Sequence, residues 1–462
     1  LAADQDRASL QLNRGVNTLV FKVVNTGGPA GFYFRVLPRP DELSGELASG
    51  LLPGFAMTPG LRSRFDHAWK LAFSRTYRAS RERIAGLERE LASTESQVPL
   101  TMVMKELPTP RDTYVLTRGA YDQPDLDRPV RRAVPASLGK LADDMPSDRL
   151  GLSRWMTSDD NPLVARVAVN RFWEMLFGTG IVATSEDFGM QGEWPSHPEL
   201  LDWLAVEFRE SGWDVRHVFR ILVTSSTYRQ SSRLRPDQRE RDPDNRLLSS
   251  FPRRRLTAEQ IRDQALYVSG LLVERLGGPS VKPYQPDGLW QEVAMPVSNT
   301  RNYTRGKDSD LWRRSLYTYW KRACPPPSLM TLDAPTREFC TIRRIATNTP
   351  LQALALWNDE QFVEAARVLA QRTLAEPISD GDRLSRMFLR CSGRDPGGDE
   401  LSLLMQSLAA FRERYSTAPQ DAASLLKIGE SPLPPGIDQS ELAAWTMVAN
   451  AILNLSATIT QD

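Results

Sequence analysis

The chain has 462 residues, about three times the size of an ordinary domain, so we expect two or three domains. Its 58 basic and 57 acidic residues nearly cancel, which excludes a uniformly basic nucleic-acid coat and an acidic disordered tail. No run of eighteen apolar residues occurs, so no transmembrane segment is predicted. Three His, three Cys and the lack of a Cys-x-x-Cys pair predict no metal site and no cofactor in this chain.

The N-terminal part predicts β-structure. Residues 19–24 and 31–36 have the composition of strands, and the Gly- and Pro-containing cluster 25–29 predicts the turn between them. A two-stranded hairpin is marginal by itself, so its partners are expected upstream or elsewhere in the fold. The two segments resemble the last strands of jelly-roll carbohydrate-binding modules. Residues 1–38 are therefore expected to be the C-terminal strands of a truncated β-sandwich; the alternative is a hairpin that binds nothing.

Residues 39–148 predict a linker, an amphipathic helical hairpin, short strands and a Pro-rich wrapping segment. Apolar residues follow a 3–4 spacing between Phe65 and Leu91, with charged residues around them. We interpret these charges as a solvated helix face. Short strands are expected at 101–104 and 113–116, and 118–145 is expected to be extended.

From residue 149 to 462 the pattern predicts one mainly helical domain. Asn161 precedes Pro162, capping boxes are expected at Ser196 and Thr257, and Thr349 precedes Pro350. The absence of βαβ alternation argues against a doubly wound sheet. The fold class is therefore mainly α: a multi-helix domain preceded by the hairpin and strands above. The expected helices include 163–177, 215–228, 258–272, 351–357, 360–374, 382–391, 399–415 and 439–455.

Several stretches carry a family resemblance: 160–173, 186–189, 195–204, 228–232, 314–322, 333–338, 340–344 and 347–354. They resemble the C-terminal domain of unknown function (fifteen-fifty-three) of large exported proteins of planctomycetes and related bacteria, which also carry cytochrome-c-like modules. The resemblance is expected to run from 149 to the C-terminus. It implies a periplasmic or secreted, uncharacterised, multidomain protein, and no known reaction. We expect this chain to be a C-terminal fragment that contacts upstream domains of the same protein, where any haem would lie.

One polar stretch forms the candidate site. Loops with dense polar residues often build sites, and this one is expected to thread through the centre of the helical domain. It is either a pocket for an anionic or sugar ligand or a buried ion-pair network, with each Arg meeting an acid. The candidate residues are Asp333, Arg337, Glu338, Cys340, Arg343, Arg344 and Asn348.

The cysteines leave alternatives open. Cys340 has arginines nearby that would lower a thiol pKa, but its only possible bases, three His, are distant in sequence. Cys340 is otherwise a buried residue or a disulfide partner of Cys324, a bridge that would contribute about 3 kcal/mol. Cys391 lies in register with apolar helix positions and is expected in the core.

Two aromatic residues suggest a glycan contact. Trp290 and Trp312 flank the polar stretch 296–310, and an exposed pair of indoles along a groove would suit a sugar ring. The basic cluster 253–255 has no stacking aromatic beside it, so nucleic acid is not an expected partner.

The preferred function is a non-enzymatic interaction or scaffold module of a large exported protein with a link to polysaccharide use. It is expected to be non-enzymatic because the chain shows no recognisable nucleophile and base. The alternative is a polysaccharide-active hydrolase using two of Asp333, Glu338 and Asp187. A glycosidase needs two carboxyl groups about 5–10 Å apart across a cleft.

Overall fold

The computed structural model describes residues 18, 20, 58–233 and 235–461. The strands expected at 19–24 and 31–36, and with them the truncated β-sandwich, lie outside the described residues. The chain divides into two compact units, 1–112 and 113–462. The domain boundary expected between 148 and 149 falls inside the second unit.

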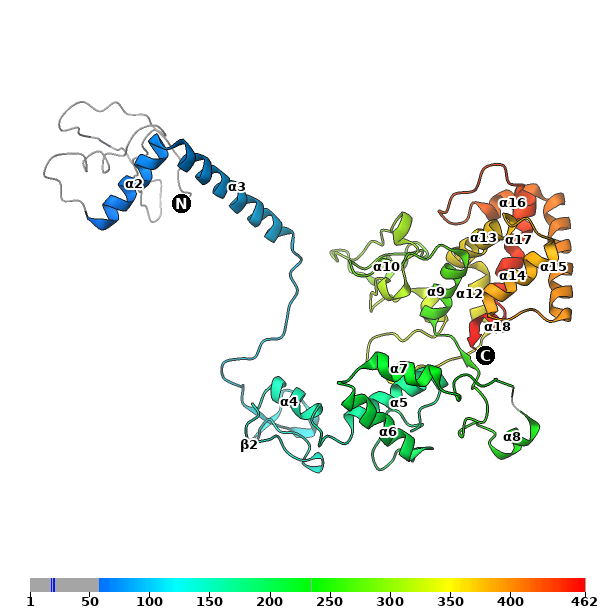
Figure 1. Cartoon of the computed structure of the whole chain (residues 1–462), viewed down its shortest axis with the longest axis horizontal. Helices are drawn as coiled ribbons and strands as arrows, with labels where there is room; N and C mark the ends of the chain where they lie inside the picture. Colours follow the sequence, from blue (N-terminus) through cyan, green and yellow to red (C-terminus); the bar gives the residue numbers. More distant parts are fainter. Residues whose placement is uncertain (1–17, 19, 21–57, 234, 462) are drawn as a thin grey trace. The chain divides into compact units, whose positions relative to one another are not determined.

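The described part of the first unit contains two helices joined at Ser74, α2 (Pro59–Phe73) and α3 (Arg75–Gln97) (Figure 1). The Ser74 hydroxyl accepts the backbone N–H of Tyr77 and so caps α3. The Arg78 guanidinium donates to the carbonyls of Leu71 and Ala72 at the end of α2, at 3.0 and 2.8 Å. Both helices confirm the helical pattern; the strand expected at 101–104 is not formed, and 98–112 contains no helix or strand.

The second unit begins with an antiparallel ribbon of β1 (Thr113–Leu116) and β2 (Pro124–Val130), connected through the 3₁₀ turn η1 (Thr117–Gly119). The strand expected at 113–116 is thus confirmed. Its partner β2 lies in the segment 118–145 that was expected to be extended, but a strand was not predicted there, because two prolines at 124 and 129 obscure the strand pattern. The 3₁₀ turn η2 (Ala136–Leu138) and α4 (Arg149–Met156) follow.

A first hydrophobic core lies among α5 (Val164–Phe177), α6 (Pro198–Glu210) and α7 (Val215–Thr224). The side chain of Asn161 accepts the N–H groups of Leu163 and Val164, both at 3.1 Å, but the N-cap residue of α5 is Leu163, so the cap expected at Asn161 with Pro162 in the first helical position is wrong. The capping box expected at Ser196 is wrong: its hydroxyl donates to the Ile181 carbonyl, and His197 is the N-cap residue. Helix α7 also ends four residues early, and the short α8 (Pro236–Arg241) follows.

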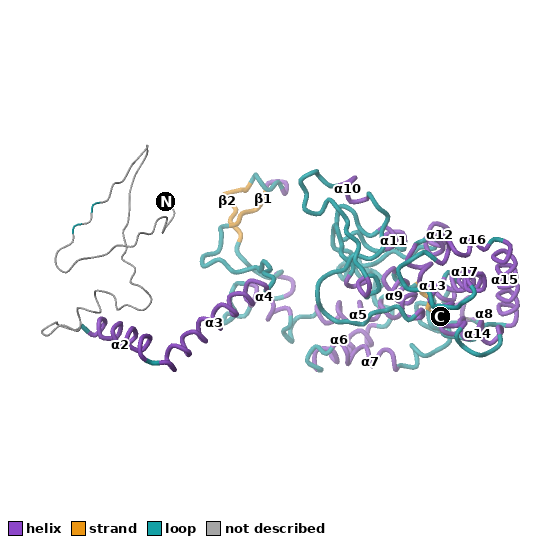
Figure 2. Tube along the Cα trace, turned by 90° about the horizontal axis from the view of Figure 1, so that it is seen from above, coloured by secondary structure: helices purple, strands orange, loops and turns teal. Residues whose placement is uncertain are grey.

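A second, larger core forms around α13 (Glu360–Leu374) and α17 (Gln439–Leu453), which pack against each other (Figures 1 and 2). Small residues allow this close approach: Ala365 and Ala366 on α13 and Ala443 and Ala449 on α17 are all fully buried. The surrounding helices are α9 (Ala258–Ser269), α12 (Pro350–Asn358), α14 (Asp380–Ser392), α15 (Gly398–Thr417), α16 (Pro419–Leu426) and α18 (Ser456–Ile459).

The helix bounds expected for the second core hold within two residues except at α9, and the short helices α16 and α18 were not expected. Helix α13 has the expected ends, and Thr257 and Gln260 form the expected capping box of α9. However, α9 stops at Ser269, because Gly270 adopts a left-handed conformation with φ +84°. Helix α16 was not expected; a Pro at its start and only eight residues made it resemble a connection.

Between α9 and α12 the chain is mostly irregular and is fixed by a buried arginine. Arg262 on α9 donates to Gln361 on α13 at 2.6 Å and to the carbonyls of Arg313 and Leu311 at 2.8 and 2.9 Å. Burial lowers the pKa of Arg262 to about 10. The short elements of this stretch are α10 (Leu289–Val293), η3 (Asp308–Asp310), η4 (Ser315–Tyr317) and α11 (Pro327–Thr331).

The end of the described chain returns to the segment between the two cores. β4 (Thr460–Gln461) pairs antiparallel with β3 (Arg254–Arg255), and Gln461 also donates to the Tyr228 hydroxyl at 2.9 Å. Seventeen α-helices against four short strands in the described residues confirm a mainly α fold. None of these helices combines the length and apolarity that a membrane crossing requires.

Candidate functional site

The polar loop, residues 333–349, is closed at its base by one carboxylate. The carboxylate of Asp333 accepts the backbone N–H of Thr347 at 2.7 Å and its hydroxyl at 2.8 Å, and it also accepts the buried amide of Gln352 at 2.9 Å. Thr349 and Gln352 form the capping box that starts α12. Gln352 therefore takes part both in the cap of α12 and in the hydrogen bonds to Asp333 that close the loop.

Beyond its base, the polar loop is exposed. Every residue from Arg337 to Ala346 is exposed, so the expectation that this loop threads through the centre of the helical domain is wrong. The reason is electrostatic, because each charged side chain would need a compensating partner in order to be buried. The centre of the second core is occupied by α13 and α17 instead.

Two arginines of the polar loop pair with acids, but these acids come from other parts of the fold. Arg343 contacts Glu186, which follows α5, at 3.3 Å, and the two side chains are 60 % and 46 % exposed. Arg344 contacts Glu259 in the first turn of α9 at 2.7 Å. The loop is thus tied to segments beside both cores.

The third arginine departs from the expectation of an acidic partner. The guanidinium of Arg337 lies 4.1 Å from the centre of the Trp320 ring, a cation–π contact. Asn348 accepts a hydrogen bond from Arg255 at 3.2 Å. The candidate polar residues are therefore held mainly by contacts within the protein.

The three carboxylates considered for hydrolysis have different local roles. Asp333 holds the base of the polar loop, and Asp187 accepts the N–H of Gly189 at 2.7 Å in its own turn. Glu338 is exposed on the loop. No group of three or more His, Cys, Asp or Glu in the described part of the chain could hold a metal ion.

All three thiols are free, so the bridge considered between Cys324 and Cys340 is not formed. Cys340 is exposed and Cys324 is half-buried. Cys391 is buried in the second core, as expected, and burial raises the pKa of its thiol to about 12.

Each histidine ring has a partner. His217 contacts Glu207 at 2.6 Å, and His197 contacts the hydroxyl of Ser196 at 3.0 Å. His67 contacts the hydroxyl of Tyr77 at 2.7 Å. These contacts give no support to a Cys–His pair at Cys340.

The two candidate groove aromatics are not presented as an open pair. Trp290 is only 1 % exposed, and the ammonium groups of Lys321 and Lys282 lie 4.6 and 5.3 Å from its ring centre. Trp312 packs against the second core and donates its indole N–H to Glu364 at 2.9 Å. A sugar ring needs an accessible indole face, so this burial does not support the glycan groove.

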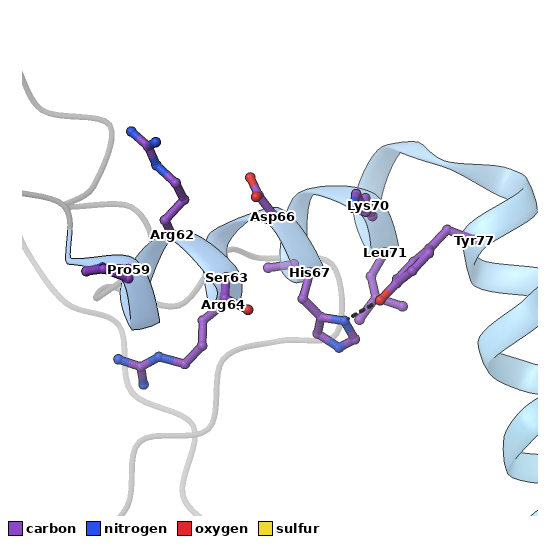
Figure 3. Close-up of a pocket in the computed structure, with 10 residues that line it drawn as sticks. Pro59, Arg62, Ser63, Arg64, Asp66, His67, Lys70, Leu71 and Tyr77 are labelled. Atoms are coloured by element: carbon purple, nitrogen blue, oxygen red, sulfur yellow. Dashed lines mark hydrogen bonds between the residues drawn. The ribbon is translucent and has the colours of Figure 1, made fainter.

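Two concavities among the described residues have no candidate polar residue in their lining. The first is an open hollow along α2 and the start of α3, where His67 points toward Tyr77 (Figure 3). Its lining consists of Pro59, Arg62, Ser63, Arg64, Asp66, His67, Ala68, Lys70, Leu71 and Tyr77. The second is a small space in the second core, lined by residues of α9, α13, α17 and α18 and their edges.

Sequence reasoning missed a set of exposed apolar side chains, which we call the loop face. They lie within sixteen residues on the polar loop and α12, and they are 44–76 % exposed. A signal for these residues was present in the sequence of α12, whose leucines are spread around the helix. Because the helix buries the side that carries Gln352 and Leu356, apolar residues on its other side stay exposed. The loop face consists of Phe339, Ile342, Ile345, Leu351 and Leu354.

Comparison with known families matches residues 148–408 to PSD1, described as a protein of unknown function (DUF1553). The match ends within α15 and not at the C-terminus as expected, although α17 beyond it packs against α13 within it. Comparisons with curated proteins and with solved structures find no match. Since the match covers more than half of the chain, the protein belongs to the PSD1 family of unknown function (DUF1553).

Proposed function

We propose that the family domain is a non-enzymatic interaction module and that the loop face is where it contacts another protein. The observation that carries this proposal is the exposure of five large apolar side chains on a segment that is otherwise tied down. Exposed apolar groups that gather on one segment favour association, because burying them against a partner removes them from water. The neighbouring arginines would supply the polar rim of such a contact.

The attachment of the polar loop supports the same function. Asp333 holds its base, and Arg337, Arg343 and Arg344 hold it at three further points. A loop that is already ordered loses less conformational entropy on binding than a free one. These four contacts would thus preorganise the polar loop for binding a partner.

The hydrolase alternative receives no comparable support. Asp333 is occupied by Thr347 and Gln352, and Asp187 by its own turn. We therefore keep the non-enzymatic module. The resemblance to exported planctomycete proteins supports a further part of the proposal: the module works in the periplasm or outside the cell, as part of a multidomain protein.

The test is co-purification from a periplasmic extract with the chain as bait, combined with Phe339→Ser and Ile345→Ser. The bound partner is expected to be lost in this double variant. Leu403→Ser on α15, where Leu403 is 63 % exposed, is the matched control and should retain the partner. Equal capture by both variants would remove the loop face from the proposal. Robust turnover of hydrolase or oxidoreductase substrates by the purified chain would contradict a non-enzymatic role.

A further inference from the structure

Within the part of the chain that the structure describes, helix α3 lacks the packing that would stabilise it. Its 23 residues span about 34 Å. Among the described residues none of α3 is buried, and Ile84, Leu87 and Leu91 are 41–58 % exposed. A single helix of this length is marginal in water, and Gly86 in its interior weakens it further. The helix therefore needs a partner surface.

The apolar residues of α3 follow a heptad pattern. Ile84 and Leu91 are seven residues apart, and Leu87 lies three residues after Ile84, which are the a and d positions of a coiled coil. Tyr77 would extend the pattern by one heptad, but its hydroxyl contacts His67 on α2 (Figure 3). The available stripe, which we call the α3 stripe, is Ile84, Leu87 and Leu91.

The charges beside the α3 stripe change sign along the helix. Arg81 and Arg83 flank its N-terminal half, and Glu88 and Glu90 flank its C-terminal half. In heptad terms Arg81 and Glu88 occupy e positions, whereas Arg83 and Glu90 occupy g positions. No ion pair engages these four side chains within the described residues, so their charges are available to a second helix.

We propose that α3 pairs in antiparallel orientation with α3 of a second copy of this chain. In this arrangement Ile84 packs against Leu87 of the second copy, because a positions face d positions between antiparallel helices. The e positions then face each other, and so do the g positions. Arg81 faces Glu88 of the second copy, Arg83 faces Glu90 of the second copy, and the two-fold axis repeats both pairs.

The parallel arrangement matches the charges less well. Its g positions face the e positions of the next heptad, so Arg83 would meet Glu88 of the second copy favourably. Glu90 would meet Glu95 of the second copy with like charge, and Arg81 would meet the neutral Thr76. Like charges at such positions select against a pairing mode. Charge complementarity therefore favours the antiparallel arrangement of the two α3 helices.

The test is sedimentation equilibrium of the full chain. A monomer–dimer equilibrium is expected with a dissociation constant of about 10–100 µM, since the stripe is short. Arg81→Glu converts two attractive contacts into two repulsive ones and should weaken the dimer at least about tenfold. Arg89→Glu makes the same charge change on the outer side of the helix and should leave the dimer intact. Equal weakening by both variants would overturn the proposal.

A second variant tests the orientation. Arg81→Glu combined with Glu88→Arg restores both attractive contacts of the antiparallel pair, so dimerisation should recover. In a parallel pair Arg81→Glu would have little effect, whereas the new arginine at 88 would face Arg83 of the second copy, so the double variant would be weaker than the single one. The unfolding transition of the second unit serves as the folding control, because α3 lies in the first unit.

A wild-type chain that stays monomeric at about 1 mM would overturn the proposal. If the amides of α3 in that monomer resist hydrogen exchange, the helix packs against its own chain instead. If they exchange freely, α3 has no stable partner.

Discussion

The Asp333 carboxylate accepts both the backbone N–H and the hydroxyl of Thr347, fourteen residues further along the chain, at 2.7 and 2.8 Å. This relationship closes the polar loop and joins it to the capping box of α12 through Gln352. Residue 333 has φ +67°, a left-handed conformation that Asp and Asn tolerate better than most residues. Both the backbone and the side chain of Asp333 therefore contribute to the loop base.

Asp333→Asn isolates the side-chain contribution, because Asn retains the tolerance for this backbone conformation. The amide cannot accept all of the hydrogen bonds that the carboxylate accepts. We expect the free energy of unfolding to fall by about 1.5–3 kcal/mol in urea titrations. Glu338→Gln, an equal charge change at an exposed position of the same loop, should cost less than about 0.5 kcal/mol. Similar losses in the two variants would show that the contacts of Asp333 are unimportant.

The pair of Arg343 and Glu186 should be weak. A buried pair would cost about 3 kcal/mol when broken, but these side chains are largely in solvent. A double-mutant cycle with Arg343→Ala and Glu186→Ala should give a coupling of about 0–1 kcal/mol that falls as salt is added. A coupling above about 2 kcal/mol would indicate that this anchor is shielded from water.

Glu400 makes the stability of the chain depend on pH in acid. Hydrogen bonds from the Arg394 guanidinium, both at 2.8 Å, and from the Gly397 N–H at 2.7 Å lower its pKa from 4.5 to about 2. Between these values the unfolded chain binds more protons than the folded chain. The stabilising contribution is therefore complete above pH 4.5 and is lost as the pH falls toward about 2.

Glu400→Gln should flatten this acid dependence of the urea midpoint between pH 5 and pH 2.5. The side chain is 41 % exposed, so solvent screening keeps the effect modest. Glu413→Gln, at an exposed position of the same helix, should keep the wild-type slope. Identical slopes for all three proteins would contradict the assignment to Glu400.

The three thiols should differ in reactivity. With a thiol reagent at pH 8, Cys340 should react first and the half-buried Cys324 more slowly. Cys391 should react only on unfolding, because it is buried and its pKa is raised to about 12. Mass spectrometry without reductant should count three free thiols. A missing pair would reveal a disulfide, and early labelling of Cys391 would show that the second core opens.

Much of the secondary structure could be predicted from the sequence because its signals are local. A helix start depends on hydrogen bonds within about four residues, so Thr257 with Gln260 and Thr349 before Pro350 mark the observed starts of α9 and α12. The full extent of α13 follows from its apolar spacing and caps. The apolar spacing that predicts the helical segment between Phe65 and Leu91 is equally local.

The tertiary structure alone decided the candidate site. Arg343 meets an acid 157 positions away, and Arg337 meets the ring of Trp320, neither of which any spacing along the chain indicates. Burial of Trp290 and exposure of the loop face depend on which surfaces the two cores use. Which charged and apolar side chains are buried depends on the packing of the whole fold, because a charge is buried only where a partner is available. The sequence determines which side chains are present, but not which of them find a buried position.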